Sequence, residues 1–216
     1  MTPFPDALHI VVVLAAVALA PFVAVMVTSF INLVVVFALI RNALGIQQIP
    51  PNMVVNGLAI ILTLYIMAPV GEEMYAAVKA RNIRTAEVGS FLEAAGAARE
   101  PLRRFLLKHS RQAERVFFME SARSLWPEER ARELRQDDLM VLVPAFTVSE
   151  LTSAFQIGFL LYLPFVAIDL VVSNILLAMG MMMVSPMTIS LPFKLLLFVL
   201  VDGWGRLVHG LVLMYR

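Results

Sequence analysis

One apolar run, from Ala154 to Val184, constrains this chain more than any other stretch. As a helix it exceeds the roughly 20 residues that cross the hydrocarbon core of a membrane. It nevertheless carries Gln156, Asp169 and Asn174, and polar side chains within a membrane mostly face protein or water rather than lipid. The run therefore predicts a helix in a packed membrane assembly or beside a protein-lined path, not a lipid-facing anchor.

A cluster of methionines ends this run. Five of the thirteen methionines lie in one short segment: Met179, Met181, Met182, Met183 and Met187. Thioether side chains are unbranched and deformable, so they can close around objects of different shape. Gly180 and the Ser185-Pro186 pair flank the middle three, and both disfavour a continuing helix. We therefore expect Met181, Met182 and Met183 to lie on a loop.

The composition is that of a polytopic membrane protein. Hydrophobic residues make up 60% of the chain and the mean hydropathy is +0.84, well above the range of soluble domains. A net charge of +1 gives no large positive field, so no nucleic-acid partner is expected. Without cysteine, the chain can form no disulfide, zinc-thiolate site or iron-sulfur cluster.

Charge divides the chain into three regions. Residues 1–71 predict an apolar helical hairpin, residues 72–143 a charged helical region, and residues 144–216 a second apolar hairpin that contains the methionine segment. Thirteen basic and ten acidic side chains fall between Lys79 and Asp138, a balance typical of solvated helices. The predicted fold is all-α, a polytopic membrane-type protein of kinked helical hairpins around a charged middle.

In the first hairpin, the apolar stretch from Ile10 to Ile40 is too long for one span. Pro21 removes a backbone donor, and the polar Thr28 and Ser29 follow, so a kink or break is predicted here. A single long tilted helix is the alternative. A turn at Pro50-Pro51 should precede a second helix that runs from about residue 52 to residue 70.

Prolines also mark boundaries in the rest of the chain. Pro101 fits the first position of a helix, and Pro144 should end the charged region. Thr147 with Glu150 then fits a capping box at the start of the next helix. Near the carboxyl terminus, the polar group from Asp202 to Arg206 interrupts the apolar sequence and predicts two short helices packed within protein.

No motif for catalysis is present. The three histidines are scattered, and no metalloprotease, nucleophile-elbow, phosphate-loop or dinucleotide fingerprint occurs. His109 falls on an apolar helical face with Phe105 and Leu106, which predicts a packing residue rather than a metal ligand. We expect no enzymatic activity and no cofactor.

Two long motifs resemble the SctR family (YscR, HrcR; flagellar counterpart FliP) of type III secretion export-apparatus proteins. The first is AFQIGFLLYLPFVAIDLVVSNILLAMGMMMVSP, followed by ISLPFKLLLFVLVDGW; the second, upstream, is LIRNALGIQQIPPNMVVNGLAIILTLYIMAPV. The resemblance implies a core subunit of the export gate, which forms the channel for unfolded proteins across the bacterial inner membrane. Five copies would join SctS-type and SctT-type subunits in a helical ring.

The resemblance also implies roles for particular residues. Met181, Met182 and Met183 would form the closed gate. Lys194 is costly to bury alone and needs an acid; by resemblance, Glu150 of a neighbouring subunit would supply it. In the alternative, Glu150 completes its capping box and Lys194 extends to an interface.

Two further polar residues are expected to serve packing. Asp169 should accept hydrogen bonds from a neighbouring helix or subunit, because an unpaired buried carboxylate is unstable. Asn174 is grouped with it as a buried polar packing residue.

Two other functions fit part of the sequence. Asp169 and Asn174 suggest the ion site of a coupled permease, although no internal repeat is visible. A purely structural assembly scaffold is the other alternative. Charge and resemblance also disagree on orientation: the basic middle region favours the cytoplasm, whereas the family places its counterpart on the periplasmic side, and we follow the family.

Overall fold

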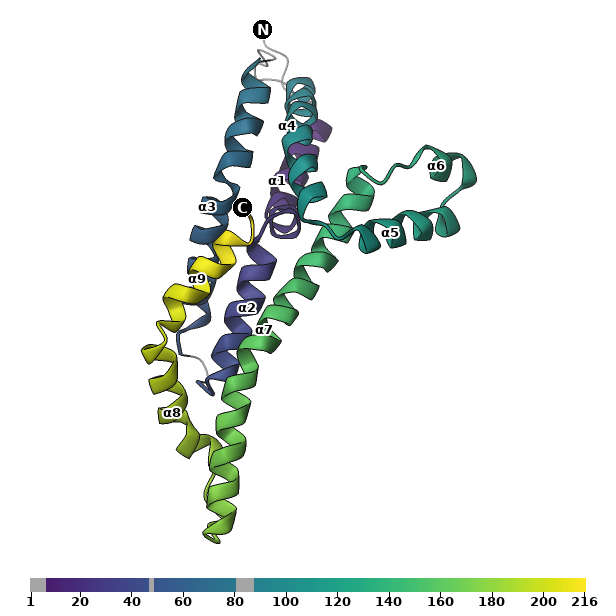
Figure 1. The fold of residues 1–216 in the computed structure, drawn as a ribbon. Coiled ribbons are helices and arrows are strands. Elements are labelled where there is room, and N and C mark those ends of the chain that lie inside the picture. The colour runs from purple at the N-terminus through teal and green to yellow at the C-terminus, as the bar shows by residue number, and fades with distance from the viewer. Residues whose placement is uncertain (1–6, 47–48, 81–87) are drawn as a thin grey trace. The chain divides into compact units, whose positions relative to one another are not determined.

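Every regular element in the described part of the chain is an α-helix. The computed structural model describes residues 7–46, 49–80 and 88–216. Its helices are α1 (Ala7–Val27), α2 (Phe30–Ala43), α3 (Asn52–Ala80), α4 (Val88–His109), α5 (Gln112–Leu125), α6 (Glu128–Glu133), α7 (Leu139–Ala178), α8 (Pro186–Leu200) and α9 (Gly203–Leu213) (Figure 1). The prediction of an all-α fold is confirmed.

Several of these helices can cross a membrane. By length and composition α3 and α7 are each sufficient, and the two broken pairs, α1 with α2 and α8 with α9, raise the number to as many as four within the described residues. The chain is therefore a polytopic membrane-type protein, as predicted.

The break in the first apolar stretch lies at Thr28 and Ser29, between α1 and α2. The predicted interruption is confirmed at the polar residues, whereas Pro21 lies inside α1. The Thr28 hydroxyl donates to the Ala24 carbonyl (2.7 Å) and accepts from the Phe30 amide (3.5 Å). Such side-chain bonds compete with the helical ladder, which explains a break after the proline rather than at it.

Other helix ends also differ from the prediction. The second helix begins at Asn52, as predicted, but continues through Pro69 to Ala80 instead of ending at residue 70. Pro101 lies inside α4 and Pro144 inside α7. The predictions that Pro101 begins a helix and that Pro144 ends the charged region are therefore wrong. A proline costs one backbone hydrogen bond. At Pro144 the buried Leu142, Ala145 and Phe146 favour a continuous helix, since tertiary packing overrides local propensity.

The described residues group into two compact units. The first comprises Met1–Ile31 and Met67–Glu150; the second comprises Asn32–Ile66 and Leu151–Arg216. Helices α3 and α7 pass from one unit to the other, so the units do not follow the composition boundaries at residues 71 and 143. The composition boundaries separate apolar regions from a charged, solvated one, and that division stays a prediction.

In the first unit, α4 packs against α1. Its Phe105 ring lies 5.7 Å from that of Phe146 on α7. At its end the Arg111 amide donates to the Ser149 hydroxyl of α7 (2.9 Å). An aromatic contact and a hydrogen bond thus join α4 and the segment after it to α7 within this unit.

In the second unit, α2 supplies the core and four aromatic rings connect the helices. Leu33, Val36 and Phe37 on α2 are fully buried. The ring centroids of Phe37 and Trp204 are 6.2 Å apart, those of Trp204 and Phe198 5.6 Å, and those of Phe198 and Phe165 6.4 Å. This chain of rings joins α2, α9, α8 and α7.

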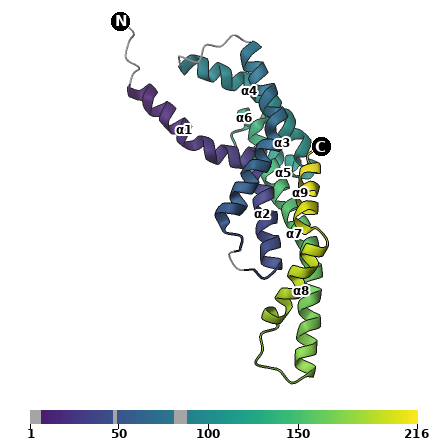
Figure 2. The same ribbon diagram turned by 90° about the vertical axis from the view of Figure 1, so that its left-hand side faces the viewer.

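The carboxyl-terminal helices form the predicted broken pair. Helix α9 is bent by 59° from α8, and Asp202 at the corner has a left-handed backbone (φ 52°), a conformation that aspartate tolerates better than most residues. Helix α8 runs back beside the last part of α7, as both ribbon views show (Figure 2). The turn between them carries the methionines.

Candidate functional site

The methionine segment is a loop between the end of α7 at Ala178 and the start of α8 at Pro186. Gly180 has a left-handed backbone (φ 72°) and the Met181 amide donates to the Leu176 carbonyl (2.9 Å), an arrangement that ends helices. Ser185 is extended, and Pro186 occupies the start of α8. The predicted helix break and loop are confirmed.

The loop holds its thioethers away from the rest of the chain. Met183 is 101% exposed, Met182 81% and Met181 40%. A cluster of unbranched apolar side chains on a loop is costly to leave in water, so it calls for a protein or membrane environment. Their role as a gate stays a prediction.

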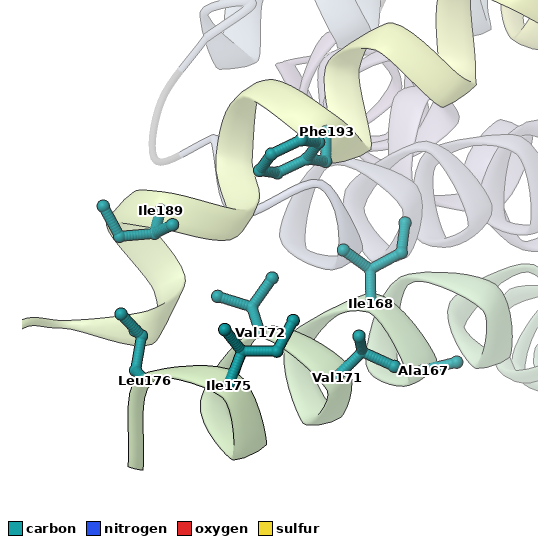
Figure 3. Close-up of a pocket in the computed structure, with 8 residues that line it drawn as sticks. All are labelled: Ala167, Ile168, Val171, Val172, Ile175, Leu176, Ile189 and Phe193. Atoms are coloured by element: carbon teal, nitrogen blue, oxygen red, sulfur yellow. The ribbon is translucent and has the colours of Figure 1, made fainter. Parts of the chain in front are cut away.

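An apolar groove of about 530 Å³ separates α7 from α8 next to this loop. Ile189 and Phe193 of α8 face a row of α7 side chains across it (Figure 3). The α7 side of the lining consists of Ala167, Ile168, Val171, Val172, Ile175 and Leu176. The two arms of the hairpin are therefore not packed tightly against each other near the methionines.

Beyond the groove, a buried ion pair ties the arms together. The Lys194 ammonium of α8 lies 2.6 Å from Asp169 Oδ2 of α7 and donates to the carbonyl of Ala43 (3.2 Å). The Ser190 hydroxyl donates to the other carboxylate oxygen of Asp169 (2.5 Å). Ala43 is the last residue of α2, where the helix dipole is negative and favours a cation.

This ion pair is largely shielded from solvent. The Lys194 side chain is 3% exposed and that of Asp169 29%. A buried ammonium needs a counter-charge and hydrogen-bond acceptors, and here it has both. The pair joins α7 and α8 to the carboxyl-terminal end of α2 in one small polar centre.

Comparison with known proteins identifies the family. Residues 13–211 match the model of the FliP family. The chain belongs to the FliP family. It is 56% identical over 215 residues to Yop proteins translocation protein R of Yersinia pestis, covering 100% of this chain and 99% of that protein.

Two other relatives support the same branch of the FliP family. The hypersensitivity response secretion protein HrcR of Ralstonia nicotianae is 52% identical, with 96% of each chain covered. Virulence protein YscR of Salmonella typhimurium is 50% identical, with 96% of this chain and 97% of that protein covered. This FliP-family chain thus matches the SctR (YscR, HrcR) branch that its motifs resemble.

The partner of Lys194 within this FliP-family chain was missed by the sequence reasoning. The prediction paired Lys194 with Glu150 of another subunit, whereas its partner within one chain is Asp169. A signal existed: Asp169 and Lys194 lie equally far along the chain on either side of the Met181-Met182 bond, so a hairpin that turns there brings them level. The contact between chains stays a prediction.

Asp169 and Asn174, the two predicted polar packing residues, differ in their surroundings. Asp169 accepts hydrogen bonds from a neighbouring helix, the kind of contact foreseen for it; its part in assembly stays a prediction. Asn174 was expected to be buried but is exposed in the single chain. It lies on a stretch of α7 where Val171 and Ile175 are exposed as well. Its burial against another subunit stays a prediction.

Glu150 and Thr147 do not mark a helix start, since α7 already begins at Leu139. The Thr147 hydroxyl lies within hydrogen-bonding distance of the carbonyls of Val143 (2.9 Å) and Met26 (3.1 Å). The predicted capping box is therefore wrong. Glu150 is buried, at 3% exposure.

His109 packs where the apolar face of α4 ends. Its ring centroid lies 4.7 Å from that of Phe105. Burial lowers its pKa below the ordinary 6.5, and the neighbouring Lys108 charge lowers the pKa further. In the part of the chain that the structure describes, no group of three or more histidine or acidic side chains could hold a metal.

Proposed function

We propose that this chain is a core subunit of the export gate of a type III secretion system. In this role, copies of the chain form the channel through which unfolded proteins cross the bacterial inner membrane. The match over almost the whole chain to proteins named for translocation and secretion supports the proposal. The apolar helices support a place in the membrane.

The observation that carries the proposal is the methionine loop. Met181, Met182 and Met183 leave the helix together and are exposed at the turn of an apolar hairpin. Repeated around the axis of a ring, three unbranched thioethers per chain form an apolar constriction that excludes ions at rest. The same side chains deform when a polypeptide passes, whereas β-branched residues are stiff at χ1.

Assembly follows from the apolar surface of the single chain. Phe159, Leu160 and Val199 are 65%, 66% and 73% exposed, and large exposed apolar surfaces mark contacts with protein or lipid. In this proposal five copies join SctS-type and SctT-type subunits, and the assembled core extends to the periplasmic side. The chain itself catalyses no reaction, and partner proteins supply the energy.

The test replaces Met181, Met182 and Met183 together by alanine in the assembled complex. A gate predicts greater small-ion leak through liposomes that contain the intact complex, because three shorter side chains per copy no longer close the path. Secretion is measured in the same strain. Met53→Ala is the matched control, since Met53 is 82% exposed but lies at the start of α3; it should leave the leak unchanged.

The outcome that overturns the gate is unchanged conductance in a triple-alanine complex of correct composition. That result favours a scaffold without a path through the methionines. Substrate-dependent ion flux by the purified chain alone would instead favour a permease.

A further inference from the structure

Two of the three predicted gate methionines of the loop are much more exposed than the third, which makes them candidates for oxidation. Met183 is fully exposed at 101% and Met182 is 81% exposed, whereas their neighbour Met181 is half as exposed as Met182, at 40%. Thioether oxidation follows solvent access, and it converts an apolar, flexible side chain into a polar sulfoxide. In the single chain the loop therefore leaves two thioethers open, and in the proposed ring a small neutral oxidant in the channel would reach them first.

We infer that Met182 and Met183 form an oxidative modification site, at which a peroxide converts both thioethers to sulfoxides and opens the resting gate to ions. The inference rests on the proposed function. It adds a reaction, an order of reactivity among the three methionines, and a consequence for the closed channel.

The reaction is balanced with hydrogen peroxide as the only co-reactant. A lone pair on the methionine sulfur attacks one peroxide oxygen, so that an S–O bond forms and the O–O bond breaks. The departing hydroxide takes up the proton left on the transferred oxygen and leaves as water. Sulfur loses two electrons to the peroxide, and no metal or cofactor is required.

The backbone explains why these two side chains are the reactive ones. Helix α7 ends at Ala178, Gly180 in the loop after it is left-handed, and Met182 and Met183 occupy the turn that follows. Side chains on a helix are shielded in part by the turns around them, whereas residues at a loop tip lack that cover. Met181 is the first residue after the glycine, and its amide is still bonded back to Leu176 (2.9 Å).

The consequence for the gate follows from polarity. An apolar constriction blocks ions because water leaves it. A sulfoxide oxygen is a strong hydrogen-bond acceptor that holds water, and burying it without a donor is unfavourable. Two sulfoxides per chain, repeated around a ring, would keep the constriction wet and let small ions through.

The experiment treats the assembled complex in liposomes with hydrogen peroxide over a time course. Peptide mass spectrometry gives the sulfoxide fraction at each methionine, and ion leak is recorded at the same times. We expect Met182 and Met183 to oxidise several-fold faster than Met181, and the leak to rise in parallel. Methionine sulfoxide reductases of both stereochemical types should reverse the leak.

Two variants make the result specific. In Met182→Leu with Met183→Leu, apolar side chains remain but cannot be oxidised, so peroxide should not raise the leak above that of the same complex untreated. Met53→Leu removes an equally exposed thioether outside the loop and should respond to peroxide as the unmodified complex does.

The outcomes separate this inference from the proposed function. Slow oxidation at Met182 and Met183, or an equal peroxide-induced leak in the double leucine variant, overturns the modification site even if the triple-alanine complex leaks. If the triple-alanine complex does not leak, the gate itself is wrong.

Discussion

At the scale of single residues, the main finding is a lysine satisfied inside an apolar hairpin. Lys194 has one carboxylate and one helix-terminal carbonyl as acceptors, and the Ser190 hydroxyl holds the far side of that carboxylate. Removing one member of such a pair costs more than the pair contributes, because the remaining charge stays buried.

Asp169→Asn should therefore destabilise the chain by about 3 kcal/mol, at the lower end for a broken buried pair because Asp169 is partly exposed. Ser190→Ala, which removes only one hydrogen bond, should cost about 1 kcal/mol. Thermal unfolding in detergent measures both. Equal losses for the two variants would show that the charge of Asp169 is not what Lys194 requires.

His109 gives a pH dependence whose sign can be worked out. Burial lowers its pKa in the folded chain, so the unfolded chain binds a proton more readily. Stability is then full above the unfolded pKa of about 6.5 and falls as the pH drops through it toward the folded value. We expect the unfolding temperature to fall between pH 7.5 and pH 5 by a larger amount than in His109→Phe. An identical fall in both proteins would contradict this assignment.

At the scale of elements, local backbone chemistry explains some helix ends and not others. The left-handed Gly180 and Pro186 bound the methionine loop, and Thr28 and Ser29 separate α1 from α2. In contrast, Pro21 and Pro101 sit within helices. A proline removes one backbone hydrogen bond, and at both positions the helix continues despite that loss.

Close helix contact in the second unit predicts the effect of one glycine. A Cβ at Gly158 on α7 would lie 3.0 Å from Leu39 Cβ and 3.2 Å from its Cγ on α2, and would collide with its Cδ1. Gly158→Ala should destabilise the fold by roughly 1–3 kcal/mol. Gly57→Ala is the matched control, because a Cβ at Gly57 meets nothing within 4 Å and alanine favours the helix.

Denaturant unfolding in mild detergent compares these variants. Adding Leu39→Ala to Gly158→Ala should recover part of the loss, since it removes the Leu39 atoms that collide. If Gly158→Ala is as stable as Gly57→Ala, the contact between α2 and α7 is looser than the structure indicates.

At the scale of the whole molecule, the single chain exposes more apolar surface than a soluble protein tolerates. Large side chains on α7 and α8 lie open, among them Phe159, Leu160, Phe193 and Leu200. Such surfaces call for lipid or further subunits. The proposed ring supplies those contacts, and the predicted pair between Glu150 and Lys194 of neighbouring copies can be tested on the same assembly.

Cysteine pairs give that test a clean background, because the chain has no cysteine. With Glu150→Cys and Lys194→Cys in one chain, a flexible thiol-reactive crosslinker should yield a ladder of covalent oligomers. A crosslinker is needed because a glutamate–lysine pair can hold its Cα atoms farther apart than the roughly 7 Å that a disulfide bridges. Asp169→Cys with Lys194→Cys is the control: these residues are paired within one chain, so no ladder should appear. Only monomers from the first pair, in a complex of normal mass, would rule out the contact between neighbours.

The sequence by itself determined the all-α membrane class, the methionine loop and the interruption at Asp202. Each depends on local chemistry: apolar length, a glycine free to adopt the left-handed region, and a proline at a helix start. The FliP-family motifs are equally a property of the sequence.

Only the tertiary structure decided which acid neutralises Lys194 and where several helices end. The pairing of Lys194 depends on the register between α7 and α8, which side-chain packing sets over many residues. Helix α7 continues past Pro144 for a related reason, since Phe146 there is buried against Phe105. Packing energies of this kind exceed the local preferences on which a sequence prediction rests.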